Sequence, residues 1–164
     1  FGLLDGLLLA AAGSLVMLIA HAARPSVALL GREPLTGEFV NRARYPNARD
    51  PLGAIVIRSP GAWLYFNAEH IRRSVLDMVA NAPDSTRLLV IDCSIVPRID
   101  TTAGTTLRVL ARSLKARRIR IALAGLRDDV LENLKAVGAE EDLGPIAPHR
   151  SIEDCLKQTL RLDS

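Results

Sequence analysis

The chain has 164 residues, of which 49% are hydrophobic and 4% aromatic, and its formal net charge is +3. This length is typical of one compact domain with an added tail or membrane segment. The small net charge, without basic clusters and interleaved aromatic residues, argues against nucleic-acid binding. The only cysteines, Cys93 and Cys155, lack the spacing of metal ligands. We expect both to be reduced packing residues of a cytosolic domain.

The chain begins with an apolar run, and residues 6–20 contain no charged side chain. With Asp5 tolerated near one end, the run reaches the roughly 20 residues that cross a bilayer. A buried core helix or the apolar part of a signal peptide has a similar composition. A signal peptide, however, carries its basic residues before the apolar run, whereas here they follow it. By the positive-inside rule the chain after the run is cytoplasmic. Because the chain does not begin with methionine, we expect residues 1–21 to be the last transmembrane helix of a longer protein.

Residues 22–50 have the composition of a linker, with three prolines and five arginines. These arginines could contact anionic lipid headgroups or lie in solvent as in an ordinary juxtamembrane loop. A short apolar run at residues 26–31 predicts an edge strand. We therefore place the folded domain in residues 51–164.

The first predicted elements of this domain form a hairpin. Residues 54–58 are rich in β-branched side chains, a Pro-Gly turn follows, and the aromatic run 63–66 predicts a second strand. Asn67 is a good N-cap for the next helix, whose apolar residues recur at helical spacing. We expect the aromatic run to lie in the core. If Trp63 were exposed, it could instead contact a partner subunit or a membrane domain.

The rest of the chain alternates between apolar strands and amphipathic helices. The strand at residues 87–92 is apolar without alternation, which is typical of a parallel sheet covered on both faces. Such an alternation predicts an α/β fold with a mixed sheet and parallel strands in its middle. The remaining expected elements are a helix at 100–117, a strand at 119–124, a helix at 126–137, a short strand at 146–147, and a final helix from Ser151 with a capping box to Asp154.

A small polar cluster, Asp100-Thr101-Thr102-Ala103-Gly104, connects the buried strand 87–92 to the next helix. The simplest interpretation is helix capping, worth on the order of 1 kcal/mol. The alternative is a switch, because a phosphate on a hydroxyl at a helix N-terminus meets free N–H groups and the positive end of the helix dipole. In that case Asp100 would oppose the added charge or help to bind Mg²⁺ in a kinase complex.

No catalytic constellation is present in the sequence. There is no phosphate-binding loop of the GxxxxGK type, no Gly-x-Ser-x-Gly elbow, and no cysteine–histidine pair placed as a nucleophile. The three histidines, His21, His70 and His149, are scattered and show no metal-ligand spacing. We therefore expect no enzyme, no cofactor and no metal site.

Several segments together resemble a STAS domain, the module shared by anti-sigma factor antagonists and the C-termini of sulfate permease (SulP) anion transporters. They are LLVID (88–92) with the polar cluster, IRIALAGL (119–126) and VGAEEDLG (137–144). The apolar helix, the arginine-rich linker and LYFNAE (64–69) resemble the linker and domain start of bacterial SulP proteins.

This resemblance implies a STAS-like mixed sheet with helices packed on it, preceded by one transmembrane-type helix. It also implies a multi-pass inner-membrane protein that carries sulfate or bicarbonate, coupled to Na⁺ or H⁺, by helices upstream of this chain. Residues 22–164 would be cytoplasmic and would assist folding, dimerisation, trafficking or regulation. Its partners would be the protein's own membrane domain, a second copy in a homodimer and the lipid bilayer.

In anti-sigma factor antagonists the corresponding motif is Asp-Ser-Ser-Gly, with a phosphorylated second serine. The resemblance aligns that serine with Thr102 and the aspartate with Asp100, whereas threonines replace both serines and Ala103 replaces the glycine. We expect the helix tip formed by Asp100, Thr101, Thr102 and Gly104 to contact a partner or subunit.

Two further functions stay open on the sequence. One is a free-standing switch protein, similar to anti-sigma factor antagonists, that binds a partner kinase and is controlled at Thr102. The other is a regulatory module that binds a nucleotide, with its phosphates at the helix tip.

Overall fold

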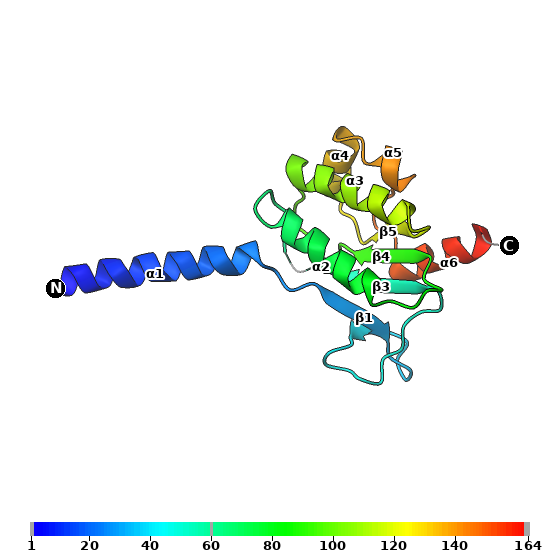
Figure 1. The fold of residues 1–164 in the computed structure, drawn as a ribbon, viewed down its shortest axis with the longest axis horizontal. Helices are drawn as coiled ribbons and strands as arrows, with labels where there is room; N and C mark the ends of the chain where they lie inside the picture. The colour runs from blue at the N-terminus through cyan, green and yellow to red at the C-terminus, as the bar shows by residue number, and fades with distance from the viewer. Residues whose placement is uncertain (1, 60, 163–164) are drawn as a thin grey trace.

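The computed structural model describes residues 2–59 and 61–162, and its most conspicuous feature is a long helix that projects from a folded domain (Figure 1). This helix, α1 (Leu3–Ala23), has 21 residues, and none of them is buried. By length and composition it could cross a membrane. Because none of its residues is buried, it differs from the core helix of a soluble domain.

The domain is built on a five-stranded sheet in the order β2-β1-β3-β4-β5. Strands β3, β4 and β5 run parallel, β1 pairs with β3 in antiparallel fashion, and β2 pairs with β1 in antiparallel fashion. The predicted mixed sheet is therefore confirmed. The strands are β1 (Ala28–Arg32), β2 (Phe39–Asn41), β3 (Ala54–Arg58), β4 (Leu88–Asp92) and β5 (Arg120–Ala124).

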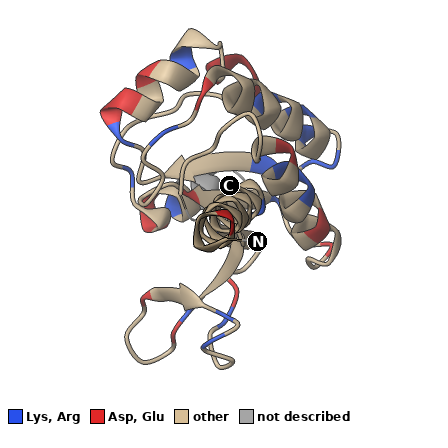
Figure 2. Cartoon of the chain, turned by 90° about the vertical axis from the view of Figure 1, so that its left-hand side faces the viewer, with Lys and Arg blue, Asp and Glu red and all other residues tan. Residues whose placement is uncertain are grey.

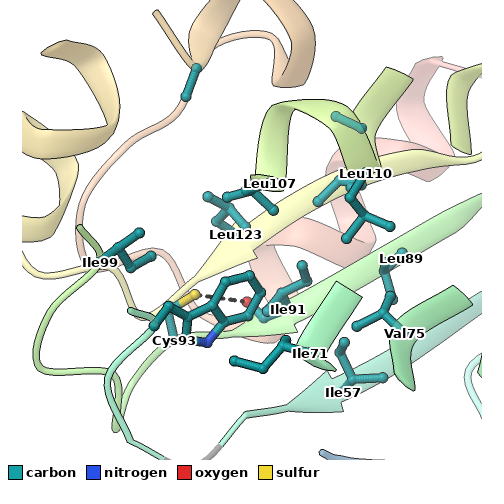
Figure 3. Packing of buried hydrophobic residues seen from close by; sticks show 14 of the residues in the cluster. Ile57, Ile71, Val75, Leu89, Ile91, Cys93, Ile99, Leu107, Leu110 and Leu123 are labelled. Carbon is teal, nitrogen blue, oxygen red and sulfur yellow. Dashed lines mark hydrogen bonds between the residues drawn. The ribbon is translucent and has the colours of Figure 1, made fainter. Parts of the chain in front are cut away.

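Helices cover both faces of this sheet. α2 (Ala68–Ala80) and α3 (Thr101–Lys115) pack on one face, where their apolar side chains meet those of β3 and β4 (Figure 3). α6 (Ile152–Leu162) packs on the other face. Side chains alternate between these faces along each strand, and both are buried, which explains why β3 and β4 are apolar up to their last residues. Two short helices, α4 (Asp128–Ala136) and α5 (Glu140–Leu143), complete the layer next to α3.

Four expectations about secondary structure need correction. Residues 63–66 form no strand: Trp63 makes one isolated bridge to Ile99, and the hairpin does not exist because β3 pairs with β1 and β4. Residues 146–147 also form no strand. The strand expected near residues 26–31 exists as β1, but it is not an edge strand, because the unforeseen β2 pairs outside it. The short helix α5 was likewise not foreseen.

Trp63 is buried and belongs to the core. The alternative of a partner contact through an exposed Trp63 therefore does not apply. The prediction that the aromatic run lies in the core is wrong for Tyr65 and Phe66, which are exposed. The boundaries at 1–21, 22–50 and 51–164 stay a prediction, and the structure places both β1 and β2 within 22–50.

A charged cluster joins α3 to α5. Arg108 donates to the carboxylate of Asp142 from Nε at 2.6 Å and to Val137 O from Nη1 at 2.7 Å. Arg112 Nε donates to the same carboxylate at 2.7 Å. These two guanidinium groups, Arg112 foremost, hold the pKa of Asp142 at about 2, below its ordinary value of 3.8. The cluster thus holds α5 against α3.

Asp142→Asn is expected to remove a stabilisation that depends on pH. Because the pKa in the folded state is lowered to about 2, this stabilisation is fully present above the ordinary pKa of 3.8 and disappears as the pH falls toward 2. Thermal unfolding of both proteins across this range should show a melting-temperature gap that closes at low pH. The pKa of Glu69 is also held at about 2, by Arg72 and Arg73. Glu69 is present in both proteins, so its contribution does not change the difference in melting temperature between them. A gap that persists unchanged in acid would contradict the prediction.

Candidate functional site

The carboxyl ends of β3, β4 and β5 meet at one edge of the sheet, because parallel strands end on the same side. The polar cluster at the start of α3 lies at this edge, as do the turn at residues 61–67 and the loop after β5. The edge is on the side from which α1 projects (Figure 1). We treat it as the candidate site.

Asp100 organises the centre of this edge. Its Oδ1 accepts a hydrogen bond from Ala103 N at 2.8 Å, so Asp100 is the N-cap of α3, as predicted. Its Oδ2 accepts a second bond from Tyr65 N at 2.8 Å. Its own backbone N–H donates to Trp63 O at 3.0 Å. Asp100 therefore holds the start of α3 and the turn before α2 together, across 35 residues of sequence.

Thr101 and Thr102 occupy the first turn of α3, and both are exposed. Their carbonyl oxygens accept bonds from the hydroxyls of Thr105 and Thr106 at 3.0 and 2.9 Å. Within the described part of the chain, no hydrogen bond of the Thr101 or Thr102 hydroxyl is seen. Both hydroxyls are thus available to a partner or a modifying enzyme.

Gly104 lies two positions after Thr102 in α3 and is buried. A Cβ atom at this position would come within 2.9 Å of Val137 Cγ2, next to the end of α4. The structure therefore gives Gly104 a packing role between α3 and α4, whereas Thr101 and Thr102 face outward.

Asn67 has a role that its N-cap position did not suggest. It precedes α2 as predicted, but its side chain does not cap that helix. Instead, Oδ1 accepts a bond from Leu64 N at 2.9 Å. Nδ2 donates to Ala62 O at 3.0 Å and to Ala22 O, in the last turn of α1, at 3.3 Å. Asn67 thereby joins the end of α1 to the turn that Asp100 holds.

An ion pair lies beneath the same edge. Arg58 Nε donates to Asp92 Oδ2 at 2.6 Å, and these residues end the paired strands β3 and β4. The Asp92 side chain is 4% exposed, and its Oδ1 accepts a further bond from Ser94 N at 3.0 Å. The sequence analysis missed this pair. The polar residues that end two adjacent apolar strands, Arg58 and Asp92, are the signal that could have revealed it.

The chemistry of the edge is that of a binding surface. Among the described residues, no group of three or more histidine, cysteine or acidic side chains is placed to hold a metal ion. Cys93, at the end of β4, is buried, and burial raises the pKa of its thiol. A protonated, buried thiol is a poor nucleophile. The exposed hydroxyls and aromatic rings of this edge are suited to contact with another surface.

Asp100→Ala is expected to destabilise the domain by about 2 kcal/mol, because it removes both the cap of α3 and the anchor of the turn. Asp100→Asn retains one acceptor oxygen and should lose about half as much. Urea unfolding of the two variants measures the difference. Asp128→Ala, at an exposed position, serves as the control. If the alanine and asparagine variants were equally stable, the two-bond role of Asp100 would be wrong.

Comparison with known proteins shows the family to which this chain belongs. The family model described as the STAS domain matches residues 45–153. A probable sulfate transporter 3.5 from Arabidopsis thaliana is 28% identical over 152 residues, which cover 93% of this chain and 24% of that protein. The chain spans about a quarter of the length of the curated relatives it matches.

Solved structures show the same fold. The murine solute carrier 26 family member A9 anion transporter, in its inward-facing state, matches with a TM-score of 0.79 at 20% identity, covering 96% of this chain and 26% of that one. The SulP transporter STAS domain from Vibrio cholerae matches with a TM-score of 0.56 at 21% identity, covering 74% of this chain and 91% of that one. With the family model matching most of the chain and sulfate transporters among its relatives, the chain belongs to the STAS family, as a STAS domain of the SulP type.

Proposed function

We propose that this chain is the last transmembrane helix and the cytoplasmic STAS domain of a SulP-type secondary anion transporter. The observation that carries the proposal is α1, a 21-residue apolar helix without a buried residue, directly preceding a STAS domain. The sulfate transporters among the relatives support it. In this proposal the transported anion is sulfate or bicarbonate, coupled to Na⁺ or H⁺, and it crosses the membrane through helices outside this chain.

The domain itself has a role in assembly or regulation and no enzymatic activity. We propose a multi-pass protein of the inner membrane, a homodimer, with residues 1–21 in the membrane and 22–164 in the cytoplasm. The pairing of β1 with β3 supports a further point, namely that the 22–50 linker is anchored in the sheet. A movement of the domain would then reach α1 through a short connection at residues 24–27.

The helix tip is the proposed contact surface for a partner or subunit. Thr101 and Thr102 would make the contact, because their side chains are exposed. Asp100 would position them through its two hydrogen bonds, and Gly104 would let α3 approach α4. This assignment separates the two residues that make the contact from the two that position them.

The natural full-length protein provides the test. We expect it in the membrane fraction, resistant to alkaline extraction, and we expect cells that express it to take up radiolabelled sulfate or bicarbonate. A cysteine at Val109, an exposed position in α3, should react with a membrane-impermeant maleimide only in inverted vesicles, since the domain is cytoplasmic. A cysteine at Val16 in α1 should react from neither side. Recovery in the soluble fraction would contradict the proposal.

A second candidate is a phosphorylation switch, and the exposed hydroxyl of Thr102 in the first turn of α3 is the observation that favours it. A phosphate there would lie at the positive end of the helix dipole. The candidate predicts a complex with a partner kinase that is lost in Thr102→Glu and kept in Thr102→Val. The related nucleotide-binding function predicts heat of binding in calorimetric titration with ATP or GTP. A titration without heat would exclude it.

A further inference from the structure

Three large apolar side chains are exposed at the edge from which α1 projects. Tyr65, Phe66 and Ile95 are 71%, 40% and 51% exposed. The rings of Tyr65 and Phe66 meet edge to face, with their centroids 5.3 Å apart. Tyr65 and Phe66 come from the turn before α2 and Ile95 from the loop after β4, so both segments leave the carboxyl ends of parallel strands. A group of exposed apolar side chains on one surface is typical of a site that contacts a protein or a membrane.

Hydrogen bonds fix this edge relative to α1. Asn67, next to Phe66, donates to Ala22 O in the last turn of α1 at 3.3 Å. The same turn is tied to α3 by Tyr65 N and Asp100 Oδ2 at 2.8 Å. The aromatic pair is therefore held beside the end of α1. Figure 2, which views the molecule along α1 from its N-terminus, shows this face of the domain around the helix.

Two basic side chains accompany the apolar ones. Arg24 directly follows α1, and Arg98 lies in the loop before α3. Both are exposed, and within the described part of the chain neither has an ion-pair partner. Arginine next to an apolar span is attracted to anionic headgroups, and tyrosine is enriched at the same depth of a bilayer.

We propose that Tyr65, Phe66 and Ile95, together with Arg24 and Arg98, form a membrane-proximal surface that enters the headgroup layer of an anionic bilayer. The proposal rests on the proposed crossing of the membrane by α1. The aromatic rings would lie among the headgroups, and the two guanidinium groups would contact their phosphates. This surface would hold the domain against the bilayer in one orientation.

The size of the surface favours lipid over a protein partner. At their exposed fractions of 71%, 40% and 51%, the three side chains can bury at most about 400 Å². A stable protein interface buries about 600–1,000 Å² on each partner. Because α1 already anchors the chain in the bilayer, a small surface is enough for a contact with lipid. The exposed charges of Arg24 and Arg98 favour anionic headgroups as the surface that is contacted.

Spin labels on single introduced cysteines test the proposal in the 164-residue chain, reconstituted in vesicles of phosphatidylethanolamine and phosphatidylglycerol. The native thiols of Cys93 and Cys155 are buried and stay unlabelled. Labels replace Tyr65 and Ile95, and the substitution at Tyr65 keeps the backbone bond to Asp100. The controls are Val16 in α1 and Leu52, which is 95% exposed at the opposite edge, just before β3 begins.

The readout is collision of each label with oxygen, which concentrates in lipid, and with a water-soluble nickel complex. We expect the labels at Tyr65 and Ile95 to lose nickel collisions several-fold relative to Leu52, and to regain them in Arg24→Gln/Arg98→Gln. If the labels at 65 and 95 were as accessible to nickel as the label at Leu52, while the label at Val16 lay in lipid, this inference would be overturned. The proposed function would still stand. Labels shielded from both reagents would also overturn it, in favour of a protein contact. A label at Val16 exposed to nickel would overturn the proposed function itself.

Discussion

Arg58→Met is expected to lower the free energy of unfolding by about 3 kcal/mol, because it leaves the buried carboxylate of Asp92 without its counter-ion. The Asp92 side chain is only 4% exposed, and it receives the Arg58 Nε–H at 2.6 Å. Methionine fills a similar volume but donates no hydrogen bond. We place the effect at the low end for a broken buried pair, since the Arg58 side chain is itself 36% exposed and water can enter.

The matched control is Arg42→Met, which breaks the ion pair with Asp50 at the protein surface. That pair has a similar N–O distance, 2.7 Å, but its carboxylate is 31% exposed. Its loss should cost less than about 1 kcal/mol. Chemical unfolding of the two variants and the parent measures both effects. Equal losses in the two variants would show that burial of Asp92 does not govern the energetics of the pair.

The parallel part of the sheet could be predicted well from the sequence. β3, β4 and β5 lie within one residue of the strands expected at 54–58, 87–92 and 119–124. Their signal is strong because a strand covered on both faces is apolar at every position. The capping box from Ser151 to Asp154 is also confirmed, with Asp154 N donating to Ser151 Oγ at 3.1 Å. Such local signals depend on residues that are close in the sequence.

The turn at residues 63–66 shows where this reasoning fails. Its aromatic residues favour a strand by composition, and a Pro-Gly pair precedes them as in a hairpin. The conformation is decided instead by Asp100 and Asn67, which accept hydrogen bonds from the backbone of Tyr65 and Leu64. Asp100 is 35 residues away from Tyr65 in the sequence, and a pattern of neighbouring residues cannot predict a contact over that separation.

At the candidate site, too, one contact could be predicted from the sequence and another could not. The cap at Asp100 followed from its place before an amphipathic helix, and the structure confirms it. The bond from Asn67 to Ala22 did not follow from any motif, because an asparagine before a helix normally caps that helix. The sequence therefore predicted the cap at Asp100, while the contacts that tie this turn to α1 depend on the tertiary fold.

Gly125→Ala is expected to destabilise the domain by about 3 kcal/mol, from backbone strain and from a steric clash. Gly125 directly follows β5 and has a φ of +66°, a left-handed conformation that alanine disfavours. An added Cβ would also lie 2.9 Å from the backbone N and Cα of Ser94, in the loop that leads to α3. Backbone atoms cannot move aside as a side chain tip can. The loop before the polar cluster would have to shift.

Gly53→Ala separates the two causes. Gly53 has nearly the same φ, +68°, but the nearest atom to an added Cβ is Ser85 O at 3.7 Å, an ordinary contact. It should lose only the strain, about 1 kcal/mol. Urea unfolding gives both values, and amide exchange at Ala103 and Gly104 reports whether the α3 start loosens in Gly125→Ala. If both variants lost the same free energy of unfolding, the close approach of Gly125 to Ser94 would not determine the position of this loop. The helix tip would then be held by Asp100 alone.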